Sequence, residues 1–281
     1  MKEQEFFITS ENVKMPKIIY GTAWKKEKTT DYVIQAVKLG FRGIDTACQP
    51  KHYSEKLVGD ALLSLQKEGI KREDIFLQTK FTSLDGQDPN QIPYDKTANL
   101  ETQVAQSFET SQKNLHTNYV DSLVLHSPMN SESMTLRVWK AMEKIYEEKG
   151  AKQLGISNCY DLKVLKSLHK NSIIKPAVIQ NRFYKSSNYD KELRTWCDNN
   201  DIIYQSFWTL SANPNILESK EITSIAKKLS KTSPQILFRF LTQIGIAPLT
   251  GTCSEQHIKE DLSIFEFELS KTEIEQINKL F

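Results

Sequence analysis

The chain is predicted to fold as one α/β domain over residues 1–281, a (β/α)8 TIM barrel. Strand-like and helix-like runs alternate along the whole sequence, an order that builds a parallel sheet with right-handed crossovers. The 281 residues suit such a barrel, which commonly has about 250. Short strands such as LVLH are apolar on both faces, as a parallel sheet requires. An open, doubly wound sheet has the same periodicity, but the first strand is followed by no GxG.

The expected elements follow in order. The strands are KIIYG, RGID, IFLQTK, VDSLVLH, KQLGIS, AVIQ, IIYQSF and GIAP. Helices are expected at 29–38, 54–65, 99–115, 134–146, 162–168 and 189–198, followed by two helical stretches that flank Ser233-Pro234 and a last helix that ends at Phe281. Ser233 is expected as an N-cap with proline at the first helical position. Ser270 and Glu273 form a capping-box pattern for the last helix.

The composition argues against nucleic acid and membranes as partners. Lys and Arg number 37 against 35 Asp and Glu, which leaves a net charge of +2 and no basic field. No run of 18 or more apolar residues is present, and the first 17 residues lack the apolar region of a secretory signal. We therefore expect a soluble, cytoplasmic protein that acts as a monomer.

The cysteines suit a reducing compartment. Cys48, Cys159, Cys197 and Cys253 are isolated and form no CxxC pair, so we expect free thiols and neither a disulfide scaffold nor a metal site. Cys48, three residues after Asp45, is either an oxidisable thiol near a site or an inert loop thiol.

Four side chains with proton-transfer chemistry follow predicted strands. The strings GFRGIDTA, KHYSE, LQTKF and LVLHSP contain Asp45, Tyr53, Lys80 and His126. The carboxyl ends of barrel strands are where active sites of this fold lie. An acid, a phenol, an amine and an imidazole gathered there can move a proton at one point.

Three of these residues also have ordinary structural explanations when taken singly. Asp45 could cap a helix, Lys80 could be a solvated lysine of the rim, and Tyr53 could simply pack. His126, followed by Ser127 and a proline, is harder to place in a core without a partner. The ordered occurrence of all four favours the functional interpretation.

In their order and local contexts these residues resemble the catalytic tetrad of the aldo-keto reductases, and the resemblance covers nearly the whole chain. It implies that Tyr53 is the general acid that protonates a carbonyl oxygen, and that Lys80 lowers the phenol's pKa from about 10. Asp45 would pair with Lys80, and His126 would orient the carbonyl and donate to the developing oxyanion. Within the tetrad the chain departs from the family at one point: Asp45 and Tyr53 are eight residues apart instead of five, through an insertion at 49–51.

The resemblance also implies a nicotinamide cofactor, NADP(H) by family habit, with NAD(H) as the alternative. Ser157, Asn158 and Gln180 match the residues that bind the carboxamide, and Phe207 matches a ring that stacks on the nicotinamide or packs in the barrel. The full set of expected cofactor-binding residues is Thr22, Asp45, Ser157, Asn158, Gln180, Phe207, Trp208, Leu210, Thr250, Gly251, Thr252, His257, Glu260 and Asp261.

The expected phosphate site lies at 250–254, before a helix that begins near Glu255. Hydroxyls and free N–H groups at a helix N-terminus suit a phosphate. The string resembles the family's PKSxxxxRIxEN, but His257 stands where arginine is usual and Leu249 where lysine is usual. Arginine and lysine favour the 2′-phosphate of NADP. We therefore expect a weakened preference for NADPH, with Lys259 as the residue that could compensate.

The expected substrate pocket contains Trp24, with Trp208 as a second wall, and is widened where Ser127 replaces a family tryptophan. The loop 83–95 is either a flap over the substrate or a plain surface loop. Tyr94 is a candidate for the wall and Phe81 for the core.

We therefore expect an enzyme that uses NAD(P)H to reduce aldehydes or ketones without a metal. The alternatives are a cofactor-binding regulatory relative with little turnover, and an unrelated barrel such as an aldolase that uses Lys80 as a Schiff base.

Overall fold

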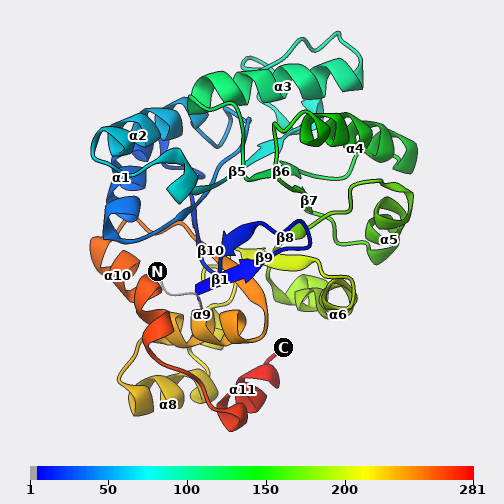
Figure 1. Ribbon diagram of the computed structural model, residues 1–281. Helices are drawn as coiled ribbons and strands as arrows, with labels where there is room; N and C mark the ends of the chain where they lie inside the picture. The colour runs from blue at the N-terminus through cyan, green and yellow to red at the C-terminus, as the bar shows by residue number, and fades with distance from the viewer. Residues whose placement is uncertain (1–4) are drawn as a thin grey trace.

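The computed structural model describes residues 5–281 and shows a closed barrel of parallel strands surrounded by helices (Figure 1). The strand order around the barrel is β10-β3-β4-β5-β6-β7-β8-β9. The strands are β3 (Ile19–Gly21), β4 (Gly43–Asp45), β5 (Phe76–Phe81), β6 (Ser122–Leu125), β7 (Leu154–Ser157), β8 (Val178–Arg182), β9 (Ile203–Phe207) and β10 (Ile246–Thr250). Because β10 pairs with both β9 and β3, the sheet closes. The predicted (β/α)8 barrel is therefore confirmed, and the open sheet is excluded; the first four residues of the predicted domain lie outside the described part.

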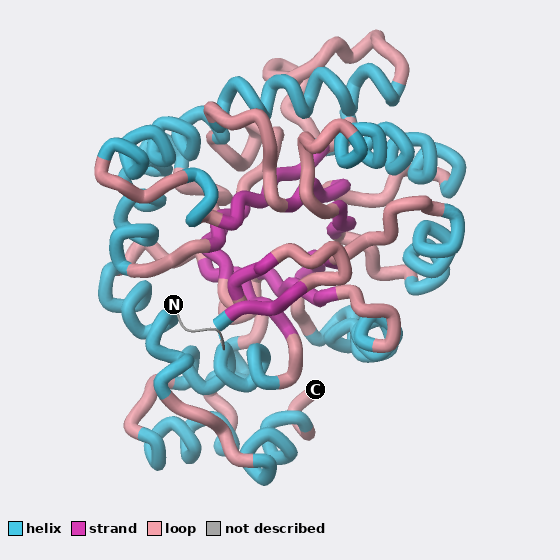
Figure 2. The backbone as a smooth tube through the Cα atoms, in the orientation of Figure 1, coloured by secondary structure: helices cyan, strands magenta, loops and turns pink. Residues whose placement is uncertain are grey.

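The helices form the outer ring (Figure 2). They are α1 (Thr29–Leu39), α2 (Glu55–Lys67), α3 (Leu100–Leu115), α4 (Glu132–Glu147), α5 (Leu162–Asn171), α6 (Lys191–Asp198), α7 (Pro214–Leu217), α8 (Lys220–Leu229), α9 (Ser233–Gln243), α10 (Glu255–Leu262) and α11 (Lys271–Asn278). The helix predicted at 189–198 begins later, because Tyr189 and Asp190 have positive φ angles of 52° and 50°. Both residues belong to a short 3-10 segment, Lys185–Asp190, that precedes α6.

The helix caps correct one prediction and confirm another. Thr232, and not Ser233, caps α9. Its hydroxyl accepts from the backbone N–H of Gln235, and the side-chain oxygen of Gln235 accepts from the backbone N–H of Thr232. Ser233 is then the first helical residue. The Ser270–Glu273 capping box forms as predicted, although α11 ends at Asn278 and not at Phe281.

An antiparallel hairpin that the sequence analysis did not predict precedes the barrel. Its strands are β1 (Phe6–Ile8) and β2 (Lys14–Pro16), and it lies over part of the barrel opening (Figures 1 and 2). Met15 is fully buried in an apolar cluster with residues of the barrel interior, among them Ile19, Phe76 and Val178. This packing covers the amino-terminal end of the barrel, so the strand ends that carry the predicted chemistry stay free.

The four cysteines are all free, as predicted. Burial raises the pKa of the Cys48 thiol well above its ordinary value, and the thiol donates to the carbonyl of Ser107 at 3.5 Å. Cys48 is therefore a protonated, packed thiol and not a reactive one. Across residues 5–281, no group of His, Cys, Asp and Glu side chains gathers as a metal site would require. Within the same residues, no helix combines the length and apolarity needed to cross a bilayer.

Candidate active site

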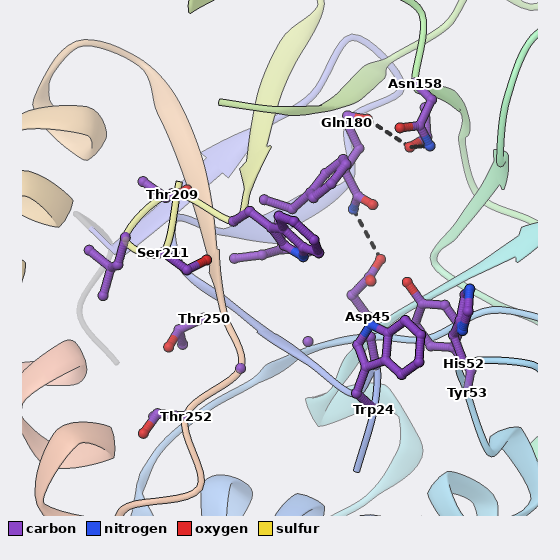
Figure 3. A pocket seen from close by; sticks show the side chains of 18 of the residues that line it. Trp24, Asp45, His52, Tyr53, Asn158, Gln180, Thr209, Ser211, Thr250 and Thr252 are labelled. Carbon is purple, nitrogen blue, oxygen red and sulfur yellow. Dashed lines mark hydrogen bonds between the residues drawn. The ribbon is translucent and has the colours of Figure 1, made fainter. Parts of the chain in front are cut away.

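A cavity of about 620 Å³ lies at the carboxyl ends of the strands. Figure 3 shows Trp24, His52 and Tyr53 on one side of it, Thr250 and Thr252 on the other, and Asp45 between them. The expected site residues that line it are Trp24, Asp45, Tyr53, His126, Ser157, Asn158, Gln180, Phe207, Trp208, Leu210, Thr250, Gly251 and Thr252. Residues from both halves of the chain thus share one cavity.

Asp45 and Lys80 form a buried ion pair at the base of the cavity. The Lys80 ammonium lies 2.7 Å from each carboxylate oxygen of Asp45 and donates to the carbonyl of Thr46 at 2.8 Å. The two residues are only 2% and 1% exposed. Lys80 does not line the cavity, because its hydrogen bonds to the carboxylate of Asp45 and the carbonyl of Thr46 hold the amine behind the cavity wall.

Three glutamines complete the surroundings of Asp45. Gln78 and Gln180 donate to its Oδ1 at 2.7 and 3.1 Å, and both also donate to the side-chain oxygen of Gln205. Only Gln180 was expected at this site. Gln78 precedes Lys80 by two residues, so strand alternation directs both side chains to the same face. Amides within otherwise apolar strands are the signal that could have identified Gln78 and Gln205.

Tyr53 lies above the ion pair, and its electrostatics correct the sequence prediction. The Lys80 ammonium is 5.1 Å from the centre of its ring, and the His126 ring is 6.0 Å away, edge to face. Burial, together with the negative charge of Asp45, raises the pKa of the Tyr53 phenol. The expected lowering by Lys80 is wrong for this state, because burial disfavours the charged phenolate and the carboxylate of Asp45 adds to that effect. The phenol therefore carries its proton at neutral pH.

His126 is a neutral imidazole. Burial, together with the positive charges of Lys80 and His52, lowers its pKa to about 3. Its Nδ1 lies 2.6 Å from Oγ1 of Thr82, and its backbone N–H donates to the carbonyl of Phe81. A neutral imidazole has one donor and one acceptor nitrogen, so it can donate to a carbonyl oxygen only through the nitrogen that bears the hydrogen.

The loop lengthened by the insertion at 49–51 builds a wall that the sequence analysis missed. Gln49 and His52 both line the cavity. The amide of Gln49 donates to the carbonyl of Gly86 at 2.6 Å, and the His52 ring lies 3.9 Å, centre to centre, from the Trp24 indole. Trp24 is 57% exposed, so this pair forms the outer rim of the cavity.

The loop 83–95 does not line the cavity. Gln87 donates to the carbonyls of Cys48 and Thr82, and the Tyr94 hydroxyl donates to that of Thr82 at 2.8 Å. Tyr94 packs against Phe81, with ring centres 5.8 Å apart, and both are buried. These bonds hold the loop against the barrel rim beside the site.

The residues expected to hold a nicotinamide lie together. The Ser157 hydroxyl donates to the backbone carbonyl of Gln180 at 2.7 Å, and the Asn158 amide donates to the carbonyl of His126 at 2.9 Å. Phe207 and Trp208 line the adjoining wall. The polar groups and aromatic rings that a flat amide-bearing ring requires are therefore present on one side of the cavity.

The expected phosphate loop follows β10. Ser254 caps α10, whose first N–H groups have no acceptors within the helix. Lys25, which the sequence analysis missed, donates its ammonium to the carbonyl of Gly251 at 2.8 Å and lies 3.6 Å from Sγ of Cys253. A buried cation therefore stands against this loop. The hydroxyls, the helix N-terminus and this charge fit a dinucleotide phosphate.

Besides Lys80, five expected residues lie outside the cavity wall. Thr22 is buried, and its hydroxyl donates a hydrogen bond to the carbonyl of Asp45. Ser127 is half-buried, and its hydroxyl donates a hydrogen bond to the carbonyl of His126. His257 is exposed in the first turn of α10, and Glu260 is half-buried. Asp261 is buried and accepts from the Thr250 hydroxyl at 2.8 Å; burial and the charge of Glu260 raise its pKa to about 7.

Known proteins with similar sequences are oxidoreductases. The model of the Aldo/keto reductase family matches residues 17–281. Glyoxal reductase of Bacillus subtilis is 30% identical over 90% of this chain and 83% of its own length. The NADPH-dependent alpha-keto amide reductase of Saccharomyces cerevisiae is 27% identical over 99% of this chain and 91% of its own length.

Solved structures agree with the sequence matches. An aldo/keto reductase from Brucella melitensis superposes with a TM-score of 0.83 at 30% identity, over 98% of this chain and 99% of that one. An aldo-keto reductase from a Medee basin deep-sea metagenome library gives the same TM-score at 27% identity, over 98% and 94% of the two chains. The family model covers the barrel and every residue of the cavity described above, and the chain belongs to the aldo/keto reductase family.

Proposed function

We propose that this protein is an NAD(P)H-dependent reductase of aldehydes or ketones in which Tyr53 is the general acid. The observation that carries the proposal is the shared cavity: Tyr53 and His126 line it together with Asn158 and Gln180. A carbonyl placed among them lies within reach of a proton donor and a hydrogen-bond donor.

The residues divide the work by chemistry. A reduced nicotinamide held beside Asn158 and Gln180 would supply the hydride to the carbonyl carbon. His126 donates a hydrogen bond to the carbonyl oxygen and so orients it, and Tyr53 transfers its phenolic proton to that oxygen as negative charge develops there. Burial keeps the phenol protonated before the reaction. The Asp45–Lys80 ion pair lies beside the phenol, with the ammonium 5.1 Å from the centre of its ring.

We propose NADP(H) as the cofactor, with a preference for NADPH over NADH that is weaker than is usual in the family. Leu249 lines the cavity where a cation would be expected, and His257 is an exposed imidazole. Lys259 does not compensate, because its ammonium is paired with Glu255 at 2.6 Å. Lys25 is the cation beside the loop, and it supports binding of either dinucleotide through the shared phosphates.

The substrate class that we propose is small carbonyl compounds. Relatives of this chain carry names for reduction of glyoxal and of alpha-keto amides. The cavity of about 620 Å³ has to hold both the nicotinamide and the substrate, which leaves limited space beneath the Trp24–His52 rim.

An aldolase that uses Lys80 is poorly supported. A Schiff-base lysine has to present a free amine to its substrate. The Lys80 amine is enclosed by Asp45 and Thr46 at 2.7–2.8 Å and lies outside the cavity wall. Borohydride trapping with a keto substrate in the absence of cofactor should yield no adduct.

The proposal is tested by following NADPH or NADH oxidation at 340 nm with a panel of aldehydes. Tyr53→Phe should lower kcat by at least about 100-fold while cofactor binding is unchanged. Tyr119→Phe, on a ring that packs against Arg72 and Lys152 outside the cavity, is the control and should retain wild-type kcat. Equal kcat values for wild type and Tyr53→Phe would remove Tyr53 from the mechanism. Cofactor binding without turnover of any carbonyl would favour a regulatory role.

A further inference from the structure

We propose that Thr82 is a positioning residue that fixes which ring nitrogen of His126 carries the hydrogen, so that Nε2–H is presented to the substrate carbonyl. The inference rests on the proposed carbonyl reduction and adds a residue that acts through His126. Thr82 does not line the cavity and is 3% exposed, so it does not touch the substrate directly.

His126 is a neutral imidazole in the folded protein. Its pKa, lowered to about 3 by burial and nearby positive charge, leaves the ring neutral at physiological pH. A neutral imidazole places its single hydrogen on either Nδ1 or Nε2. Only the form with the hydrogen on Nε2 can donate to a carbonyl while Nδ1 faces Thr82.

The hydroxyl of Thr82 decides between these two forms. Its Oγ1 lies 2.6 Å from Nδ1, and no other protein group within residues 5–281 bonds to it. If Nδ1 donated, the buried hydroxyl hydrogen would be left without an acceptor, and an unsatisfied buried donor destabilises that form. If the hydroxyl donates to Nδ1, its hydrogen is satisfied and the ring hydrogen resides on Nε2.

The surrounding backbone holds the Thr82 side chain in this rotamer. Gly86 lies against its methyl group: a Cβ on Gly86 would come within 2.7 Å of Cγ2. The backbone carbonyl of Thr82 accepts from the Tyr94 hydroxyl and from Gln87. The methyl therefore faces the loop while the hydroxyl faces His126, and the loop 83–95 acquires a role in aligning the site without covering it.

The direct test reads the tautomer by long-range ¹H–¹⁵N NMR on protein labelled in its five histidines. A His126→Gln variant assigns the His126 signals. Wild type and Thr82→Ser should show Nε2–H as the dominant form. Thr82→Val keeps the shape and removes the hydroxyl, so it should shift the population towards Nδ1–H. An Nδ1–H form in wild type, or an unchanged tautomer in Thr82→Val, would overturn the proposal.

Kinetics supply the second readout. Loss of a preorganised donor to the developing oxyanion lowers kcat by about 100- to 1000-fold. Because Thr82→Val only shifts the tautomer, we expect a fall in kcat of about tenfold or more with a smaller change in KM, and recovery to within about threefold in Thr82→Ser. A kcat of Thr82→Val equal to that of wild type would contradict the role.

The two proposals fail separately. The NMR result requires no turnover, so it stands even if no carbonyl substrate is reduced, and absence of turnover would then count against the proposed reaction alone. If Thr82→Val does not fold, Thr82→Ala removes the same hydroxyl and relieves any crowding against Gly86.

Discussion

The two ends of the cavity are built differently. At the reaction end, Asp45 and Lys80 are almost fully buried, and both carboxylate oxygens of Asp45 accept hydrogen bonds. At the other end, where we propose that the phosphates bind, Gly251 and Cys253 are exposed, and the exposed Lys259 is paired with Glu255. The proposed catalytic groups are thus oriented by the folded chain itself, whereas the proposed phosphate loop is more open to solvent.

The difference has an energetic consequence. A buried charge interacts strongly with its partner because little water screens it, and removing that partner leaves an expensive unpaired charge. An exposed pair is screened and contributes little. The reaction end should therefore control stability and rate, and the phosphate end should control ligand preference.

The largest expected effect is on the free energy of unfolding of Lys80→Met. It should fall by about 3–5 kcal/mol, because Asp45 is left buried without its cation. Lys259→Met removes the cation of the exposed pair with Glu255, 2.6 Å apart, and should change stability by no more than about 1 kcal/mol. Urea denaturation followed by circular dichroism measures both. Similar losses in the two variants would contradict the contrast between the two ends.

The partner substitution sharpens this test. Asp45→Asn combined with Lys80→Met removes both charges, so the double variant should be more stable than Lys80→Met alone. A double variant that is less stable would show that the amide network, and not the unpaired charge, dominates the loss.

The next effect is the pH dependence of stability that His126 contributes. Its pKa of about 3 in the folded protein lies below the value of about 6.5 expected for the unfolded chain, so the unfolded chain binds the proton first as the pH falls. The free energy of unfolding should therefore decrease by about 1.4 kcal/mol per pH unit as the pH falls from about 6.5 towards 3. The free energy of unfolding of His126→Gln should depend less steeply on pH over this range. Equal slopes for wild type and variant would show that the pKa of His126 is not lowered in the folded protein.

The smallest expected effect concerns cofactor choice at the phosphate end. The ratio of kcat/KM for NADPH over NADH should stay below about 1000, which corresponds to about 4 kcal/mol. Leu249→Lys adds a cation to the cavity wall and should raise the ratio about tenfold. Lys259→Met is the matched control and should leave the ratio unchanged, because its charge is already paired. A wild-type NADPH/NADH ratio above about 1000 would show that another cation discriminates between the two cofactors, and Lys25 would be the first residue to test.

Local signals predicted much of the fold and the site. The alternation of strand and helix runs predicted the barrel, and short motifs predicted that Asp45, Tyr53 and His126 would meet although an insertion separates the first two from their usual spacing. Capping patterns predicted the start of the last helix and missed the start of α9 by one residue. These features depend on neighbours within a few residues, which a sequence displays directly.

The residues that the sequence analysis missed depend on contacts between distant segments. Gln78 meets Gln205 across the barrel, Lys25 meets the loop after β10, and Met15 fills the barrel floor. His52 gains its role only because the lengthened loop carries it against Trp24. No local pattern specifies such pairings, since each arises from closure of the sheet.

By itself, the sequence determined the barrel and the family and supplied the candidate proton-transfer groups, because hydrophobic period and short motifs are local properties of the chain. Only the tertiary structure decided their chemical states. Burial raises the pKa of the Tyr53 phenol where the sequence predicted a lowering, and burial with nearby positive charge keeps His126 neutral. The proton affinity of a side chain depends on the solvent it loses and the charges it meets on folding, and both are set by residues far away in the chain.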